Sequence, residues 1–278
     1  MKVRSRSLPT GWYPDSAGEC KREIDDFLQG FTPPEGSWIG GVVPHAGWYF
    51  SGKLATRVIS VLSGGRSPDR VVIYGGHLGG NSSPVVYTED VWETPMGTQA
   101  MDSEIARELI ANGHAVDPGP GFADNTVEIQ LPIIKRFFDG VPVIATHSPS
   151  SEKAVQFAAA VDELLKSRGL SAVFLGSADL THYGPNYGFT PHGTGTSAVK
   201  WVKDENDHSL IRKAIAMDAQ ALLEDARAKR NTCSAGPIAS VIESAVRNGA
   251  KAGKLVEYYT SYDIMPGSSF VGYAGIIF

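Results

Sequence analysis

Residues 38–52 read WIGGVVPHAGWYFSG, a stretch in which two structural patterns meet. Residues 38–43 form an apolar run that predicts a buried strand, and residues 53–62 (KLATRVISVL) have apolar positions at helical spacing. His45 therefore lies where a strand ends and the chain turns toward a helix. In open α/β sheets this edge, beyond the carboxyl ends of the strands, is where ligands bind. One histidine at such an edge is as often an ordinary loop residue, so a site requires further residues from other strands.

The length and composition of the chain restrict its class. Its 278 residues can bury the core of one α/β domain, and we expect a single domain over residues 1–278, on which the proline-rich residues 1–37 pack as an N-terminal arm. The net charge of -5, with no basic run, argues against nucleic-acid binding. The sequence has no apolar segment of membrane-spanning length and no secretory signal, so we expect no membrane association. Two cysteines are too few for a disulfide framework and fit a reducing cytoplasm.

Three further apolar runs predict strands over residues 70–74, 141–147 and 171–176. Each run ends near side chains that can bind a metal or transfer a proton. Parallel strands present their carboxyl ends at one edge of a sheet, so we expect these side chains to meet there. Histidines in separate parts of a core have no reason to gather at one edge, so the pattern favours a shared metal or catalytic site. The residues at or just beyond the strand ends are His45, His77, His147, Asp179 and His182.

Cys233 lies just before a predicted helix over residues 238–247, where the positive end of a helix lowers the pKa of a thiol. Two imidazoles and one anionic ligand leave coordination positions open, which suits Fe(II), copper or zinc. Asp179 competes with Cys233 as the anionic ligand, and His182 could act as an acid or base beside a bound ligand. Cys233 could also be the nucleophile of a hydrolase, although the sequence shows no oxyanion element.

Segments outside these strand ends also carry expectations. A loop rich in glycine and proline is expected over residues 117–123. Asn125 and Glu128 follow it at the spacing of a capping box, and for Glu128 a capping role and a place in the site remain alternatives. Apolar residues recur at helical spacing over residues 207–230, which predicts one helix with His208 exposed near its start.

A series of short motifs runs along the chain. They are PHAG at 44–47 with FSG at 50–52, Trp92 with TPMG at 94–97 and Asp102, Glu128 with QLP at 130–132, Ser177 with Asp179-Leu180 and HYG at 182–184, and Cys233 with Gly236-Pro237. At these residues the chain resembles the Memo family, system protein B of the AmmeMemoRadiSam set, which is similar in fold to the class III extradiol (LigB-type) dioxygenases. The motifs follow the family's order from residue 44 to residue 237, so the resemblance covers nearly the whole chain.

The resemblance implies a fold and a set of site residues. The fold would be a single α/β domain of three layers, in which helices flank a mixed central β-sheet. His45, His77 and Cys233 would form a metal site, and Asp179 and His182 would line the same pocket. Cys233 falls where the dioxygenases carry a metal-binding glutamate. The catalytic residues would be Asp179, His182 and Cys233.

The resemblance also implies a function. We expect a metal-binding protein that uses non-haem iron or copper, or zinc, and has a dioxygenase-like redox function, which would make it a metal-dependent oxidoreductase. The alternatives are a module that binds a peptide or another ligand without turnover, and a zinc- or cysteine-dependent hydrolase. The expected partners are a small-molecule or peptide ligand and, by the resemblance, radical SAM and Amme-type proteins. The family usually has a histidine where Asn125 stands, which weakens a proton-transfer role for this position.

Overall fold

The structure is a computed structural model that describes residues 1–64, 67–119, 121–122 and 124–278. Positions 120 and 123 of the loop expected over residues 117–123 lie outside the described residues. Within these ranges, no helix combines the length and the apolar character needed to cross a bilayer.

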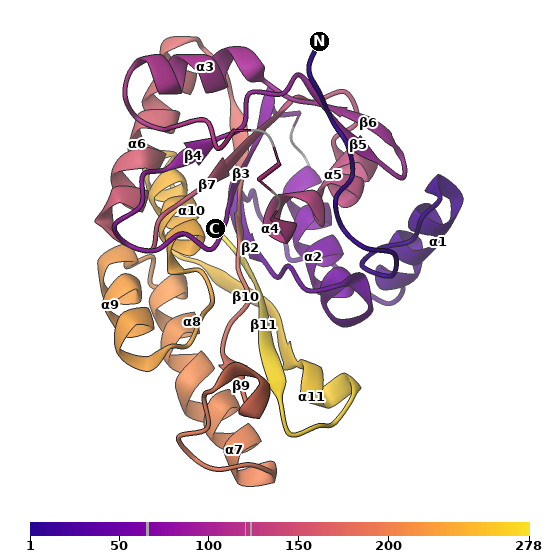
Figure 1. Cartoon of the computed structure of the whole chain (residues 1–278), viewed down its shortest axis with the longest axis vertical. Helices are drawn as coiled ribbons and strands as arrows, with labels where there is room; N and C mark the ends of the chain where they lie inside the picture. The colour runs from indigo at the N-terminus through magenta and orange to yellow at the C-terminus, as the bar shows by residue number, and fades with distance from the viewer. Residues whose placement is uncertain (65–66, 120, 123) are drawn as a thin grey trace.

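A mixed sheet forms the middle of the molecule (Figure 1). Its strands are β2 (Gly40–Val43), β3 (Arg70–Gly75), β4 (Val85–Val86), β7 (Val143–His147), β8 (Ala172–Ser177), β9 (His182–Tyr183), β10 (Lys254–Thr260) and β11 (Phe270–Ile277). They are arranged in the order β10-β11-β2-β8-β3-β7-β4, with β9 paired to β11. The central strands β2, β8, β3 and β7 are parallel, whereas β4, β11 and β10 pair antiparallel at the two sides.

Helices cover both faces of this sheet (Figure 1). On one face lie α1 (Ala17–Phe27), α2 (Trp48–Ser63), α4 (Asn125–Glu128) and α5 (Leu131–Phe137). On the other lie α3 (Ser103–Ala111), α6 (Glu152–Ser167), α8 (His208–Ile215), α9 (Ala219–Lys229) and α10 (Ala235–Arg247). A small sheet is formed by β1 (Val3–Arg4), β5 (Val91–Thr94) and β6 (Gly97–Ala100). The remaining elements are the short α-helices α7 (Thr196–Trp201) and α11 (Ser261–Ile264), the 3₁₀ helix η1 (Pro185–Tyr187) and the π-helix η2 (Val202–Asp207).

The alternation of side chains along β3 explains the three layers. Val72 and Tyr74 belong to the core beneath α6 and α10, whereas Val71 and Ile73 belong to the core beneath α2 and α5. Successive residues of a strand point to opposite faces, so an unbroken apolar run fits a strand that helices cover on both sides. The prediction of a three-layer α/β fold with a mixed central sheet is confirmed.

Two helical predictions are wrong. The helix expected over residues 207–230 is divided into α8 and α9, because Met217 adopts a left-handed backbone conformation (φ 57°) that ends α8. Asp218 then begins α9 by accepting a hydrogen bond from the backbone N–H of Ala221 (2.9 Å). His208 is half-buried, with its Nδ1 2.6 Å from the carbonyl oxygen of Lys203, so it is not the exposed residue that its position suggested.

The register of the parallel strands brings their carboxyl ends to one edge. The last residue of β2, Val43, is paired with the last residue of β8, Ser177, and Gly75 at the end of β3 is paired with His147 at the end of β7. Residues that follow β2, β3 and β8 therefore leave the sheet at the same edge. α10 packs directly on β8 there, since a Cβ atom at Gly176 would lie 2.6 Å from the carbonyl oxygen of Pro237.

Asp207 makes the stability of the protein depend on pH. Its buried carboxylate accepts hydrogen bonds from the backbone N–H of Thr181 (3.0 Å) and from the hydroxyl of Tyr258 (2.7 Å). Burial raises the pKa of Asp207 to about 6, against the opposing effect of these hydrogen bonds. The folded chain therefore holds a proton that the unfolded chain has released, and Asp207 lowers the free energy of unfolding as the pH rises from about 4 to about 6.

We expect Asp207→Asn to remove this contribution, which is at most about 3 kcal/mol at pH 7. Urea unfolding between pH 4 and pH 7 measures it. The difference in unfolding free energy between the variant and the wild type should become more favourable to the variant as the pH rises. A constant difference for Asp207→Asn would contradict the assignment.

Candidate metal centre

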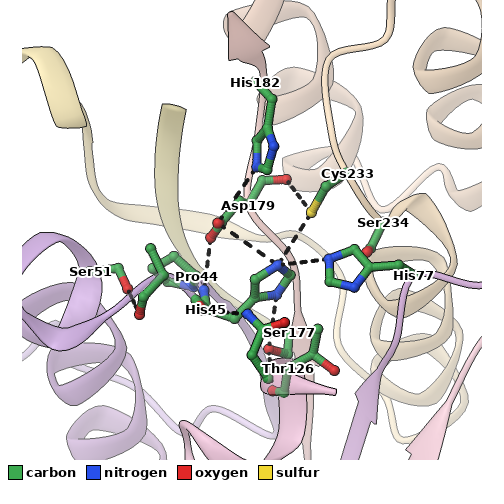
Figure 2. Close-up of polar contacts among 12 residues, drawn as sticks. Pro44, His45, Ser51, His77, Thr126, Ser177, Asp179, His182, Cys233 and Ser234 are labelled. Carbon is green, nitrogen blue, oxygen red and sulfur yellow. Dashed lines mark hydrogen bonds and ion pairs between the residues drawn. The ribbon is translucent and has the colours of Figure 1, made fainter. Parts of the chain in front are cut away.

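The three residues that the family resemblance implies as metal ligands come together at the carboxyl edge of the sheet. His45 follows β2, His77 follows β3, and Cys233 lies just before α10. Nε2 of His45 is 3.2 Å from Nε2 of His77 and 3.3 Å from Sγ of Cys233. The three ligand atoms all lie within 4.8 Å of one another, and Figure 2 shows the side chains pointing toward a common position.

The neighbours of the two imidazoles fix which nitrogen of each faces this position. The Ser177 hydroxyl donates its proton to the carbonyl oxygen of Thr126 (2.6 Å), so it can only accept from Nδ1 of His45, 3.4 Å away. Nδ1 of His77 is 3.1 Å from Oδ2 of Asp124 and donates to that carboxylate. When both imidazoles are neutral, Nδ1 of each therefore carries the proton, and both Nε2 atoms present lone pairs to the same position. Carboxylate and hydroxyl partners of this kind orient the histidines that bind metals.

This donor set fits a metal ion. At these distances the electron pairs of two imidazoles and one thiolate can be held together by a shared proton or by a metal ion. At the tetrahedral angle, two nitrogens about 2.0 Å from one ion are about 3.3 Å apart, and a sulfur about 2.3 Å from the ion is about 3.5 Å from a nitrogen. The separations from Nε2 of His45 to His77 and to Cys233 (3.2 and 3.3 Å) are close to these values. Three protein ligands leave positions open for a further ligand.

The charged groups around Cys233 favour its thiolate, the form that binds metals. Burial raises the pKa of Cys233, but His45, His182 and His77 outweigh this effect and hold the pKa well below the usual range of a thiol. The thiolate in turn helps to raise the pKa of His77 to about 10, after the larger effect of its hydrogen bond to Asp124. The second cysteine, Cys20, contrasts with Cys233: burial and nearby carboxylates raise its pKa to about 11, as expected for an inert thiol.

Asp179 and His182 lie beside the donor atoms, as the sequence predicts for residues that line the pocket. Oδ1 of the buried Asp179 accepts a hydrogen bond from the backbone N–H of His45 (2.8 Å), and Oδ2 lies 3.8 Å from Nε2 of His45 and 3.7 Å from Nε2 of His182 (Figure 2). Burial lowers the pKa of His182, but Asp179 and Cys233 outweigh it and raise the pKa to about 10. The pair therefore places an anionic carboxylate and a cationic imidazole next to the three ligands.

Asp124 is a functional residue that the sequence analysis missed. Its Oδ1 accepts from the backbone N–H of Thr126 (2.8 Å) and begins α4, while its Oδ2 holds His77. The capping box expected from Asn125 and Glu128 is therefore wrong, because Asp124 is the capping residue. The preference of helix starts for aspartate was a usable signal for the cap, but nothing local indicated the contact with His77, 47 residues away.

Two positions that the sequence analysis singled out, His147 and Asn125, contact groups next to the ligand atoms instead of the ligand atoms themselves. His147 is buried, with Nε2 3.2 Å from the Tyr87 hydroxyl and 3.7 Å from Oδ1 of Asp124, and burial lowers its pKa to about 4. It is therefore a neutral support for Asp124 and lies outside the group of three ligands. Asn125 donates from Nδ2 to the carbonyl oxygen of His45 (2.9 Å), so it fixes the backbone of one ligand.

A pocket of about 470 Å³ opens over these residues. Its volume suits a small molecule. Polar and aromatic side chains both line the pocket. The polar lining includes His45, His77, Asn125, Asp179 and His182, and the aromatic lining is Trp12, Phe50, Tyr187 and Tyr273.

Comparison with known proteins identifies the family. The model of the family described as Memo-like protein matches residues 4–277. The chain belongs to the Memo-like family. Two relatives named MEMO1 family protein, from Methanococcoides burtonii and Desulfurococcus amylolyticus, are 30% and 31% identical to it, each over at least 99% of both chains. A crystal structure of an uncharacterized protein from Escherichia coli K12 superimposes with a TM-score of 0.49 and 13% identity, covering 86% of this chain and 99% of that one.

In this Memo-like chain we expect Asp124→Asn to weaken metal binding by about 10–100-fold. The amide oxygen can still begin α4, but an amide N–H in the place of Oδ2 cannot accept from Nδ1 of His77. Competition with a chromogenic chelator measures the affinity for Fe(II) and Cu(II). Asp139→Asn, at a side chain that is 76% exposed, is the control and should match the wild type. Wild-type affinity in Asp124→Asn would show that His77 is not held as a ligand.

Proposed function

We propose that this chain is a metal-dependent redox protein that holds iron or copper between His45, His77 and Cys233. The observation that carries the proposal is the convergence of two imidazole lone pairs and a thiolate on one position. A ligand set of this kind suits iron, copper or zinc, and a sulfur ligand favours the softer ions among them. Bound iron or copper would supply one-electron chemistry and open coordination positions.

The residues around the ligands support a reaction with a small molecule. The cationic imidazole of His182 can give a proton to a ligand in the pocket, and the carboxylate of Asp179 lies 3.7 Å from Nε2 of that imidazole. The aromatic side chains that line the pocket can contact an apolar part of such a ligand. A dioxygenase-like oxidation is the reaction class that we propose, in the cytoplasm, where a thiolate ligand stays reduced.

Cys233 should make this chain a poor ring-cleaving enzyme. A thiolate donates more strongly than a carboxylate and can itself be oxidised, so we expect little extradiol cleavage of simple catechols by the Fe(II)-loaded wild type. Metal content should fall on oxidation with hydrogen peroxide and return after dithiothreitol and fresh metal. Cys233→Glu should bind Fe(II) more readily and gain cleavage, followed by oxygen consumption. Efficient cleavage by the wild type that is lost in Cys233→Glu would contradict this view of the cysteine.

A second candidate is a module that binds a ligand without turnover. Apolar side chains that line the pocket are exposed to solvent, with Tyr187 40% and Met265 58% exposed, as in many interaction surfaces. If metal-free and metal-loaded protein bound a peptide or small molecule equally well, this candidate would be preferred.

A cysteine hydrolase has less support, because the backbone N–H of Cys233 donates to the carbonyl oxygen of Asp179 (3.2 Å) and is not free for an oxyanion. The radical SAM and Amme-type partners stay predictions.

A further inference from the structure

Glu128 binds the N-terminal segment of the chain. Its carboxylate is 3% exposed and receives hydrogen bonds from the backbone N–H of Ser7 (2.9 Å), the backbone N–H of Leu8 (3.0 Å), the hydroxyl of Ser7 (2.5 Å) and the hydroxyl of Tyr13 (2.7 Å). All these donors come from residues 7–13, which we call the strap. A buried carboxylate satisfied in this way is a strong attachment, because hydrogen bonds to charged groups are stronger than those between neutral groups.

A second attachment fixes the strap at Trp12, close to the metal ligands. The carbonyl oxygen of Trp12 accepts a hydrogen bond from the backbone N–H of Trp48 (2.8 Å), the first residue of α2. α2 starts three residues after His45, and among the described residues no side chain caps its start. The ring of Tyr13 packs edge-on against the indole of Trp48, with centroids 6.3 Å apart. The strap therefore crosses the start of the helix that follows the first ligand.

Trp12, whose carbonyl oxygen makes the second attachment, lies between residues bound to Glu128 and lines the same pocket as His45 and His77. From this arrangement we propose that Glu128 is a positioning residue, which fastens the strap so that Trp12 forms a specificity-determining wall of the pocket. The proposal rests on the proposed function of that pocket as a metal site. An indole wall favours a flat apolar group on the small molecule in the pocket. The position of the indole depends on the carboxylate of Glu128, which contacts the strap.

Trypsin tests the attachment without any metal. The bond between Arg6 and Ser7 can enter a protease only when the N–H of Ser7 leaves Glu128. In metal-free protein, Glu128→Gln should be cut at this bond about tenfold faster or more than the wild type, with the product identified by mass spectrometry. Glu35→Gln, which removes an exposed carboxylate, should be cut at the wild-type rate. Equal rates for Glu128→Gln and the wild type would overturn the proposal.

Quenching of tryptophan fluorescence by Cu(II) tests the wall. The contribution of Trp12 is the difference in Cu(II) quenching between the wild type and Trp12→Phe. The same difference is then measured between Glu128→Gln and the double variant Glu128→Gln/Trp12→Phe. It should be much smaller than in the wild-type background, because the indole of Trp12 has moved away from the ion. A general loss of stability would not give this result, provided that the melting temperatures lie well above the assay temperature. An undiminished Trp12 contribution in the Glu128→Gln background would overturn the wall.

Two variants approach the same contact from the strap, in case Glu128→Gln does not fold. Tyr13→Phe removes one donor and should speed cleavage after Arg6. Ser7→Pro removes two donors, and because trypsin does not cut an Arg–Pro bond, its faster cleavage should be seen after Arg4. Both variants should reduce the contribution of Trp12 to Cu(II) quenching. Unchanged cleavage and quenching in both would overturn the proposal. If the wild type shows no saturable Cu(II) quenching, the proposed metal function and the wall fail together, and the cleavage rates still decide whether Glu128 fastens the strap.

Discussion

Cys233→Ala is expected to weaken the binding of iron and copper by more than about 100-fold, beyond what the loss of a supporting residue costs. The change removes the only anionic donor among the three converging atoms and leaves His45 and His77 as the remaining ligands. Competition titration and metal analysis of protein purified without chelator measure the loss. The matched control is Cys20→Ala, which removes the buried thiol whose pKa is raised, and should keep the wild-type metal content.

The outcome for Cys233→Ala also separates the two candidates for the anionic ligand. If Asp179 were the ligand in place of Cys233, the variant would keep most of its affinity and Asp179→Asn would lose it. The structure places the sulfur 3.3 Å and the nearer Asp179 oxygen 3.8 Å from Nε2 of His45. We therefore expect the larger loss from Cys233→Ala.

Gly176→Ala is expected to lower the free energy of unfolding by about 3 kcal/mol, at the upper end of overpacking costs. The new Cβ would lie 2.6 Å from the carbonyl oxygen of Pro237, and backbone cannot move aside as a flexible side chain can. α10 would have to shift, and Cys233 lies two residues before α10, so metal affinity should fall as well. Urea unfolding and chelator competition measure the two effects.

Gly79→Ala is the matched control for this glycine. A Cβ at Gly79 meets no atom within 4 Å, so the free energy of unfolding should stay within about 0.5 kcal/mol of the wild type. If Gly176→Ala were equally mild, the contact between β8 and α10 would not be close enough to set the position of Cys233.

The sheet and its ligand-binding edge could be predicted because their cause is local. A strand buried on both faces is apolar over most of its length, so β3, β7 and β8 appear in the sequence as mainly apolar runs. Strand ends then place His45, His77 and Asp179 at one edge for any parallel arrangement. The participation of Cys233 was suggested by its place before a helix, and its selection as a ligand came from the family resemblance.

The supporting residues could not be predicted because their partners are distant in sequence. Asp124 contacts His77 across 47 residues, and Glu128 contacts Ser7 across 121 residues. Both had a plausible local role at the start of a helix, and the structure shows that only Asp124 has that role. The break between α8 and α9 depends on the left-handed conformation of Met217, which the periodic apolar pattern does not reveal.

X-ray absorption at the metal edge tests the central claim most directly. Protein reconstituted anaerobically with one equivalent of Fe(II) or Cu is compared with Cys233→Ala treated in the same way. The account predicts one sulfur neighbour at about 2.3 Å and two imidazole nitrogens at about 2.0–2.1 Å from the metal in the wild type, with the sulfur absent in the variant. A wild-type spectrum with only oxygen and nitrogen neighbours, unchanged in Cys233→Ala, would contradict the assignment of His45, His77 and Cys233 as the metal site.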